Sequence, residues 1–343
     1  MFTVQTPAPR ADWSAVAAQD PRSLADQSPQ WIDAVCAGGH YRDVSRYYAF
    51  ADGRAFVLPM VARVRTAGRG WLMSPPPAWG FGGLVGAGLD RGVVAAVLQD
   101  LASLGALRIS IRPDPLHADV WAGAATANVT RVPRYAHVVD LGAGREAVDR
   151  AFSKSARRGV RQALRAGVTI RTEHTGALLG EHYALYLSSV QRWAARQREP
   201  LALARWRASR RDPLAKLEAM ARCLGPAFCQ HVAYHDGRPV ASSIVLLGAS
   251  AHDTRGAMDR DLAAPVYAND LLQAHALHHA VDHGCRFYHL GESAGSASLA
   301  HFKEKFGARG YAYAEIRMER LPLTSADAFA RGAVKRAIGF RDA

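Results

Sequence analysis

The stretch "HDGRPVASSI" at residues 235–244 repeats an earlier stretch, "ADGRAFVLPM" at residues 51–60. In both, Asp-Gly lies between short runs rich in apolar and aromatic residues, a pattern typical of the two-residue turn of a β-hairpin. The glycine of such a turn takes a positive φ, which costs it no steric strain. We therefore expect two hairpins, one in each half of the chain.

The segments that follow the two hairpins also repeat. "VVAAVLQDLASLGALRISIRPDP" (93–115) and "LLQAHALHHAVDHGCRFYHLGES" (271–293) each read as a helix, a glycine and a strand. The hairpin glycine and the second glycine are 52 residues apart in the first half and 47 in the second. A chain of 343 residues is also natural for two domains. The repeat predicts a duplication, with domains at residues 1–150 and 151–343.

Strands and helices mix along the whole chain, and the predicted hairpins make the strands largely antiparallel. Neither GxGxxG nor GxxxxGK[ST] occurs, so the usual dinucleotide and P-loop motifs are absent from the sequence. We expect an α+β fold of two tandem domains, each with a mixed, mostly antiparallel sheet flanked by helices. Further helices are expected after Ser28 and over residues 91–104, 181–197 and 268–283.

The chain is strongly basic, with a net charge of +13 and a pI near 10.0. This favours an anionic partner such as nucleic acid, a phosphate-bearing cofactor or a nucleotide-linked substrate, although a composition rich in arginine gives the same number. No apolar run reaches the about 18 residues that a membrane span requires. The first residues lack a signal-peptide core, and the four cysteines are scattered. We expect a cytoplasmic protein with reduced thiols.

A basic segment, "FSKSARRGVRQALRAGVTIR", covers residues 152–171. Its cations recur at helical spacing with no acid among them, after a serine that can cap the helix. Like charges on one helix repel each other, and bound phosphates would remove that cost. The alternative is a solvated helix between the domains. The candidate phosphate-binding residues are Lys154, Arg157, Arg158 and Arg161.

Six segments of the chain, in order, carry a resemblance to a known family. The segments are "SPQWIDAV" (28–35), "SPPPAWGFGG" (74–83), "SKSARRGVRQALRAGV" (153–168), "LYLSSVQRW" (185–193), "DGRPVASSIVL" (236–246) and "GCRFYHLGESAGSASLAHFKEKFG" (284–307). On these segments the chain resembles the double-GNAT proteins, and within them the compact FemX/FemAB-like transferases.

The resemblance implies that the protein forms amide bonds. In such transferases an aminoacyl group moves from aminoacyl-tRNA to an amine of a peptide or small-molecule acceptor, and the protein is expected to act as a monomer. Related members use an acyl thioester instead, so an acetyl-CoA-dependent N-acetyltransferase is the alternative. A third possibility is a catalytically inactive protein that binds tRNA. The reaction needs positioning, stabilisation of an oxyanion and a route for a proton.

The resemblance places the oxyanion-stabilising group at Lys303, with the ring of Phe302 holding its ammonium by a cation–π contact. Without the resemblance, "HFKEKFG" reads as an amphipathic surface turn. The candidate substrate-binding residues are Trp79, in a Pro-Gly loop, Tyr267, and Glu292 at a strand end. Such loops and strand ends also occur as plain turns and caps.

The sequence departs from the acetyl-CoA pattern of ordinary GNAT enzymes. Those enzymes grip pyrophosphate with backbone N–H groups of a Gly-rich turn that opens a helix. Here the corresponding stretch, "DRDLAAPVYANDLL" (259–272), has Ala263 in place of the first glycine, and Pro265 lacks an N–H. This favours aminoacyl-tRNA as donor, with no other cofactor.

Three histidines, His275, His279 and His283, share one face of the expected helix. Histidines at i and i+4 can bind zinc. The sequence has no acidic HExxH context here, so we expect an ordinary helix face and no metal site.

Overall fold

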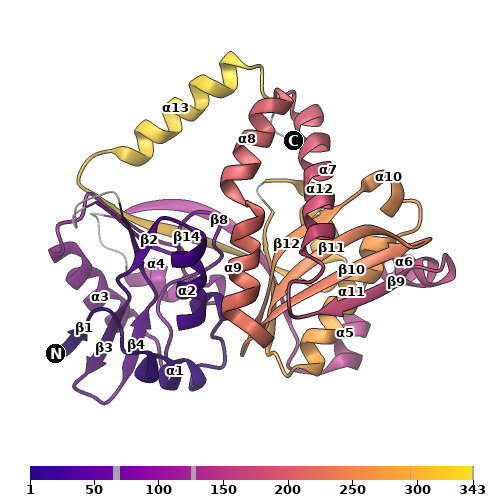
Figure 1. Ribbon diagram of the computed structural model, residues 1–343. Helices are drawn as coiled ribbons and strands as arrows, with labels where there is room; N and C mark the ends of the chain where they lie inside the picture. The colour runs from indigo at the N-terminus through magenta and orange to yellow at the C-terminus, as the bar shows by residue number, and fades with distance from the viewer. Residues whose placement is uncertain (65–69, 125–128, 294, 342–343) are drawn as a thin grey trace.

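The computed structural model describes residues 1–64, 70–124, 129–293 and 295–341 (Figure 1). The strands are β1 (Phe2–Gln5), β2 (Tyr41–Asp43), β3 (Arg46–Phe50), β4 (Ala55–Leu58), β5 (Val61–Arg63), β6 (Trp71–Ser74), β7 (Arg108–Ile111), β8 (Thr130–Asp140), β9 (Thr169–Glu173), β10 (Phe228–His235), β11 (Arg238–Leu246), β12 (Ala251–Met258), β13 (Phe287–Glu292) and β14 (Arg309–Glu319).

The helices are α1 (Arg10–Ala18), α2 (Pro29–Gly38), α3 (Arg91–Ser103), α4 (Ala118–Ala124), α5 (Arg145–Ala151), α6 (Lys154–Arg165), α7 (Leu179–Gln197), α8 (Leu201–Arg211), α9 (Leu214–Leu224), α10 (Arg260–Ala263), α11 (Ala268–Asp282), α12 (Ala297–Glu304) and α13 (Leu323–Ala337). In the part of the chain that the structure describes, no helix is long and apolar enough to cross a membrane.

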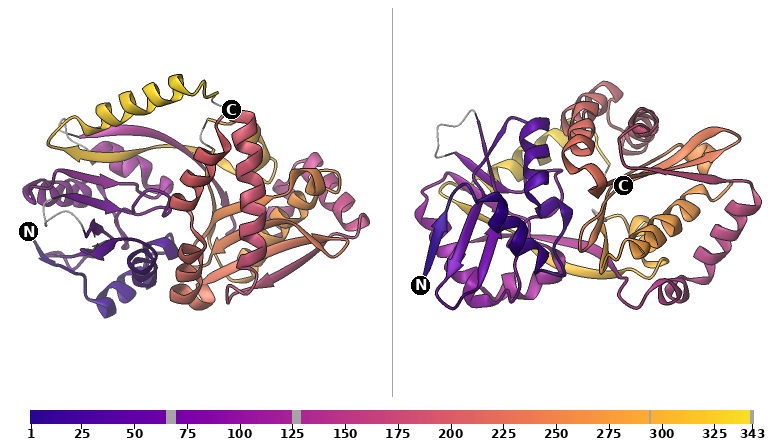
Figure 2. Two further views of the ribbon diagram at one scale, coloured as in Figure 1. Left: turned by 45° about the horizontal axis from the view of Figure 1, so that its top comes forward. Right: turned by 60° about the horizontal axis from the view of Figure 1, so that its bottom comes forward.

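One large sheet runs through both halves of the molecule, in the order β2-β5-β6-β7-β14-β8-β13-β12-β11-β10-β9, and β1, β3 and β4 form a smaller sheet. Neighbouring strands are antiparallel except for β6 with β7 and β12 with β13. Helices flank the sheet, as Figures 1 and 2 show. The expected α+β fold, with mixed and mostly antiparallel sheets flanked by helices, is confirmed.

Both predicted hairpins are present. In the second, β10 pairs with β11 around a turn in which Asp236 and Gly237 take φ values of 50° and 73°, as a tight hairpin turn demands. In the first, β3 pairs with β4. That hairpin then bends and continues as β2 with β5, and at the bend the hydroxyl of Ser45 accepts from the N–H of Met60 at 3.0 Å.

The two halves interpenetrate in the middle of the large sheet. Strand β14, near the end of the chain, lies between β7 and β8 and is antiparallel to both. On its other side, β8 pairs with β13. A hydrophobic cluster also spans the halves and includes Trp31, Trp79, Leu217 and Met220. The halves therefore share both a sheet and a core.

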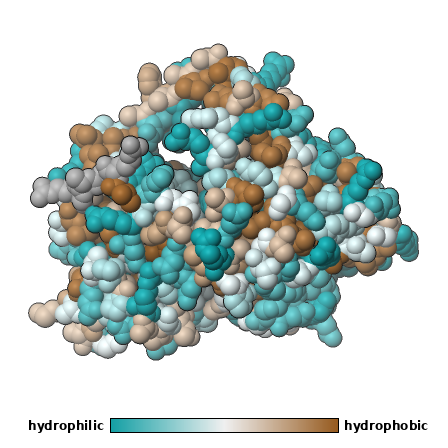
Figure 3. All heavy atoms as spheres, viewed as in Figure 1, coloured by the Kyte–Doolittle hydropathy of each residue, from teal (hydrophilic) through white to brown (hydrophobic). Residues whose placement is uncertain are grey.

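Helix α13 extends from the first half toward the tips of α7 and α8 (Figure 1). None of its residues is buried, and Phe329 is 75% exposed. The backbone N–H of Arg341, beyond the helix, donates to the carbonyl of Gln197 at the end of α7 at 2.9 Å. On the face drawn in Figure 3, hydrophobic and hydrophilic residues are interspersed.

Candidate active site

Strands β12 and β13 pair over only two residue pairs, Ala251 with Tyr288 and His252 with His289, before they separate. The register of β13 against β8 shifts beyond His289, and Gly291 takes a φ of 68°. We call the point where the strands part the strand fork, formed by Asp253 on β12 and residues 290–292 on β13. Where two strands part, their backbone N–H and C=O groups no longer bond to each other. These groups and the nearby side chains of both strands can then contact other residues or a ligand.

Lys303 reaches the strand fork from α12. The helix begins after Ser296, whose hydroxyl accepts from the N–H of Leu299, and it places Lys303 where only 5% of the residue is exposed. The ammonium donates to the carbonyls of Gly291 at 2.9 Å and Glu292 at 2.8 Å. An ammonium has three N–H groups, so these contacts leave one for a ligand.

The surroundings of Lys303 shift the pKa of its ammonium group. Burial lowers the pKa of Lys303 to about 8, although the carboxylates of Asp253 and Glu292 oppose this. The group is therefore still largely an ammonium at neutral pH. A partly desolvated cation stabilises a nearby negative charge more strongly than one in water.

Asp253 supplies the opposite charge at the fork. Burial of its carboxyl raises the pKa of Asp253 to about 6, while His252, Lys303 and a hydrogen bond from the hydroxyl of Tyr288 at 3.3 Å oppose the rise. A carboxylate whose pKa is close to neutrality is suited to accept a proton. The fork thus pairs a cation with a candidate base.

Glu292 connects the fork to β8 and β14. Its carboxylate accepts from the hydroxyl of Tyr313 at 2.5 Å and from Arg134 at 3.3 Å. Arg134 also contacts Glu315 at 2.6 Å, and Arg112 contacts it at 3.1 Å. Although burial opposes it, these cations, with Arg317, hold the pKa of Glu315 at about 2. The network fixes the carboxylate of Glu292, whose backbone carbonyl accepts from Lys303.

His137 is a further polar residue at the fork. It is buried, its Nδ1 lies 3.1 Å from the hydroxyl of Ser293, and its Nε2 lies 3.6 Å from Glu304. Burial, and then the charge of Lys303, lower the pKa of His137. The imidazole is therefore neutral at neutral pH.

The structure brings two of the predicted residues together and corrects the role of a third. Lys303 and Glu292 meet at the fork. The expected cation–π contact of Phe302 with Lys303 is wrong: the ring of Phe302 lies under Lys305, whose ammonium is 4.7 Å from the ring centroid. Lys305 also contacts both carboxylate oxygens of Asp270, at 2.7 and 2.9 Å. Phe302 thus supports a structural ion pair.

The other two predicted substrate residues lie outside this cluster. Trp79 is buried, its ring packs against Trp31, and the ammonium of Lys216 lies 4.2 Å from a ring centroid. Its contacts join the two halves rather than face the fork. Tyr267 is 37% exposed and takes a φ of 54° just before α11.

Sequence reasoning missed residues that the sheet order brings to the fork. The missed residues are Asp253, Tyr288, Tyr313, Arg134 and His137. They come from four strands, and no local motif marks them. The segment from Tyr288 to Glu292 was the available signal, because it places polar residues at the end of a strand.

The basic helix forms as predicted. Ser153 caps α6, because its hydroxyl accepts from the N–H of Ala156. Small residues face α11, and the carboxylate of Asp270 lies only 2.0 Å from where a Cβ on Gly159 would be. The four candidate phosphate-binding cations, Lys154, Arg157, Arg158 and Arg161, are exposed. Arg157 also donates to the carbonyl of Phe152 at 2.6 Å.

The segment before α11 consists of the short helix α10 and a turn at residues 264–267. In α10 and the residues after it, the N–H groups of Ala263, Ala264 and Tyr267 donate to backbone carbonyls within the segment. Pro265 has no N–H. These three N–H groups are therefore not free to bind a phosphate together. The structure thus differs here, as the sequence does, from the Gly-rich pyrophosphate-binding turn of ordinary GNAT enzymes.

Comparisons with known proteins agree with the fold. Residues 150–304 match the family model described as acetyltransferase (GNAT) domain. The crystal structure of FemX is similar, with a TM-score of 0.68 and 12% identity, covering 92% of this chain and 97% of that one. A tandem GNAT protein from the clavulanic acid biosynthesis pathway has a TM-score of 0.52 and 13% identity, over 93% and 98% of the two chains.

The third structure is the C-terminal domain of an Agrobacterium fabrum protein described as a putative lysylphosphatidylglycerol synthetase. It has a TM-score of 0.52 and 16% identity, over 95% of this chain and 96% of that domain. No curated protein sequence matches the chain. Residues 150–304 thus match a GNAT acetyltransferase domain, and over nearly its whole length the chain has a fold similar to that of FemX and of the tandem GNAT protein.

Proposed function

We propose that the protein transfers an aminoacyl group from aminoacyl-tRNA to an amine of a small-molecule or peptide acceptor. The observation that carries the proposal is the ammonium of Lys303, buried at the strand fork, with two N–H groups bound to backbone carbonyls and the third left for a ligand. That arrangement suits a carbonyl oxygen that becomes negatively charged during the reaction.

In the proposed reaction the acceptor amine attacks the ester carbonyl of the donor. The new C–N bond forms as the C=O bond becomes a C–O⁻ group, which accepts from Lys303. Asp253 takes the proton that the amine loses. When the tetrahedral intermediate collapses, the ester C–O bond breaks, and the proton passes to the departing ribose oxygen of the tRNA.

The choice of donor is supported by two features of the second half. The cations of α6 are exposed, and for Lys154, Arg158 and Arg161 the described residues offer no ion-pair partner. Before α11, the N–H groups of Ala263, Ala264 and Tyr267 are bound to backbone carbonyls, so they are not free to grip a CoA pyrophosphate as a Gly-rich turn does in ordinary GNAT enzymes. The resemblance to FemX-like transferases points in the same direction.

A second candidate is an acyl-CoA-dependent N-acetyltransferase acting on a small amine. The match of residues 150–304 to an acetyltransferase domain favours it. In both cases we propose a cytoplasmic monomer whose domains divide near residue 150, in the last turn of α5. The four cysteines, which are all free thiols, are consistent with this compartment.

The donors can be distinguished with bulk tRNA charged with radioactive amino acids and with radioactive acetyl-CoA. Each is mixed with the protein and an extract of amine-containing metabolites. We expect charged tRNA to give an acid-stable amide product, and Lys303→Met to abolish it. Product formed from acetyl-CoA alone would instead establish the second candidate. RNA binding without product from either donor would indicate a binding protein.

A further inference from the structure

A second cluster of reactive side chains lies away from Lys303, between α11 and the edge of the large sheet. Helix α11 contributes His275 and His279, and His283 follows its last residue, so the three lie at four-residue spacing. Opposite them, β10 contributes Cys229 and His231, and His174 follows the last residue of β9. Rings of His174, His231 and His283 lie 5.6, 5.0 and 4.1 Å from the ring of His279.

Hydrogen bonds account for two of these imidazoles. The hydroxyl of Thr172 lies 2.9 Å from Nδ1 of His231 and 2.8 Å from Nε2 of His275. His231 and His275 are therefore linked through Thr172, and Nε2 of His231 lies 3.4 Å from the sulfur of Cys229, where it can donate to a thiolate.

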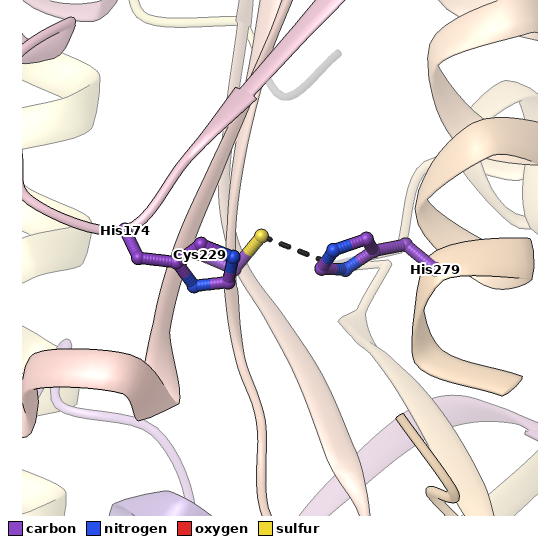
Figure 4. Close-up of side chains that lie close together, drawn as sticks. All are labelled: His174, Cys229 and His279. Atoms are coloured by element: carbon purple, nitrogen blue, oxygen red, sulfur yellow. Dashed lines mark hydrogen bonds between the residues drawn. The ribbon is translucent and has the colours of Figure 1, made fainter. Parts of the chain in front are cut away.

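The remaining groups have the geometry of a metal site. His174, Cys229 and His279 each offer one ligand atom, and these atoms all lie within 4.8 Å of one another (Figure 4). The sulfur of Cys229 is 3.7 Å from Nδ1 of His279. With Zn–S of about 2.3 Å and Zn–N of about 2.0–2.1 Å, a tetrahedral zinc ion holds sulfur and nitrogen ligands roughly 3.5 Å apart.

Backbone carbonyls orient two of the imidazole rings in a way that suits a metal ion. Nδ1 of His174 lies 2.8 Å from the carbonyl of Phe228, and a ring N–H donating there leaves Nε2 as the free ligand atom. His283 is held similarly, with Nδ1 2.8 Å from the carbonyl of His279.

We propose that His174, Cys229 and His279 bind a zinc ion, with the fourth position filled by His283 or water. Two imidazoles and a thiolate are ligands that zinc prefers. Cys229 pairs with Val245, which pairs with Asp253, so the site lies two strands from the strand fork. The ion would join the edge strand β9 and its neighbour β10 to α11, and its role is structural.

The sequence did not favour this site because its ligands come from three separate elements. His279 alone belongs to the helical histidine pattern, and His174 and Cys229 lie 105 and 50 residues before it. Only the packing of α11 against β9 and β10 brings the three together.

The test uses the full-length protein, stripped with a chelator and titrated with Co²⁺. We expect about one equivalent to bind with visible d–d bands and a near-ultraviolet thiolate-to-cobalt charge-transfer band, and Zn²⁺ to abolish both. Cys229→Ser should lose the charge-transfer band. His174→Ala, at a partly exposed position, should weaken Zn²⁺ binding by more than the about 10–100-fold that loss of an outer-shell partner costs.

The matched control is Cys285→Ser, which alters another buried thiol, bound to the carbonyl of Gly248 at 3.3 Å. It should keep the cobalt spectrum of the wild type. Far-ultraviolet circular dichroism checks that each variant folds. Wild-type protein that binds no Co²⁺, or a charge-transfer band that persists in Cys229→Ser, would overturn the proposal. If Cys229→Ser does not fold, unchanged Zn²⁺ affinity in His174→Ala overturns it independently.

Discussion

The backbone N–H of Ser153 donates to the carbonyl of Lys305 at 2.8 Å, and this bond joins the start of the basic helix α6 to the end of α12. Ser153 caps α6, and Lys305 lies two residues beyond Lys303. The exposed cations and the buried ammonium are therefore held on adjoining elements. A polyanion bound along α6 would have its end close to the strand fork.

Replacing Lys303 by Met should remove most of the transfer activity. Met fills a similar volume, so the fold should persist, but the oxyanion loses a charged donor. Loss of one such donor typically costs about 100- to 1000-fold in turnover, or roughly 2.7–4 kcal/mol. Single-turnover transfer from the donor measures the effect. A rate within a few-fold of wild type would show that Lys303 does not act on the reacting carbonyl.

Lys305→Met is the matched control, and it should behave in the opposite way. Lys305 is bound to both oxygens of Asp270, so its loss leaves a largely buried carboxylate without its cation. We expect a lower melting temperature but a nearly normal rate for each folded molecule. An equal loss of rate in both variants would mean that the two lysines act through the fold.

The pH dependence of transfer should be bell-shaped. Asp253 must be ionised to accept a proton, so activity should fall as the pH drops below its pKa of about 6. Lys303 must be protonated to stabilise the oxyanion, so activity should also fall as the pH rises above its pKa of about 8. In Asp253→Asn the rate should be low and the acid limb absent. Asp236→Asn, at an exposed turn, should leave the profile unchanged.

Neutralising α6 should weaken tRNA binding in a salt-dependent manner. The plot of log K against log salt has a negative slope. Each phosphate that the variant no longer binds should make this slope shallower by about 0.7–0.9. The variant changes Lys154, Arg158 and Arg161 to Ala and leaves Arg157, which supports the end of α5. The control removes the same charge from Arg222, Arg238 and Arg331, which lie on other elements. Equal slopes for the two triple variants would leave α6 without a special role.

Gly159→Ala should destabilise the protein, although alanine normally favours a helix. The new Cβ would lie 2.0 Å from the carboxylate of Asp270, and relieving that clash should cost about 1–3 kcal/mol. Gly180→Ala, on an exposed turn of α7 with nothing within 4 Å, should stabilise by about 0.4–1 kcal/mol. Chemical denaturation measures both. A stabilised Gly159→Ala would contradict the close packing of α6 against α11.

Local signals were enough to predict many elements of the fold. The Asp-Gly turns identified both hairpins, and serine caps identified the starts of α2 and α6. The pairing of β14 with β7 and β8 could not be predicted in this way, because it joins residues about 200 positions apart. No turn chemistry or periodicity records such a contact.

The same limit applies to the site. Lys303 and Glu292 were predicted, and they are close in the chain as well as in space. Asp253 reaches them only through the order of strands. The error over Phe302 has a local cause, because α12 is helical and residues three apart share a helix face. Helical spacing therefore places Phe302 with Lys305, and Lys303 on another face.

The central position of β14 has a consequence for biosynthesis. Until residues 309–319 leave the ribosome, β7 and β8 each have an exposed edge where β14 will lie. The first half of the chain is thus made early but cannot complete its sheet until residues 309–319 have been synthesised. Unpaired edges invite pairing with other chains. Nascent chains that stall before β14 should therefore depend on chaperones to stay free of aggregates.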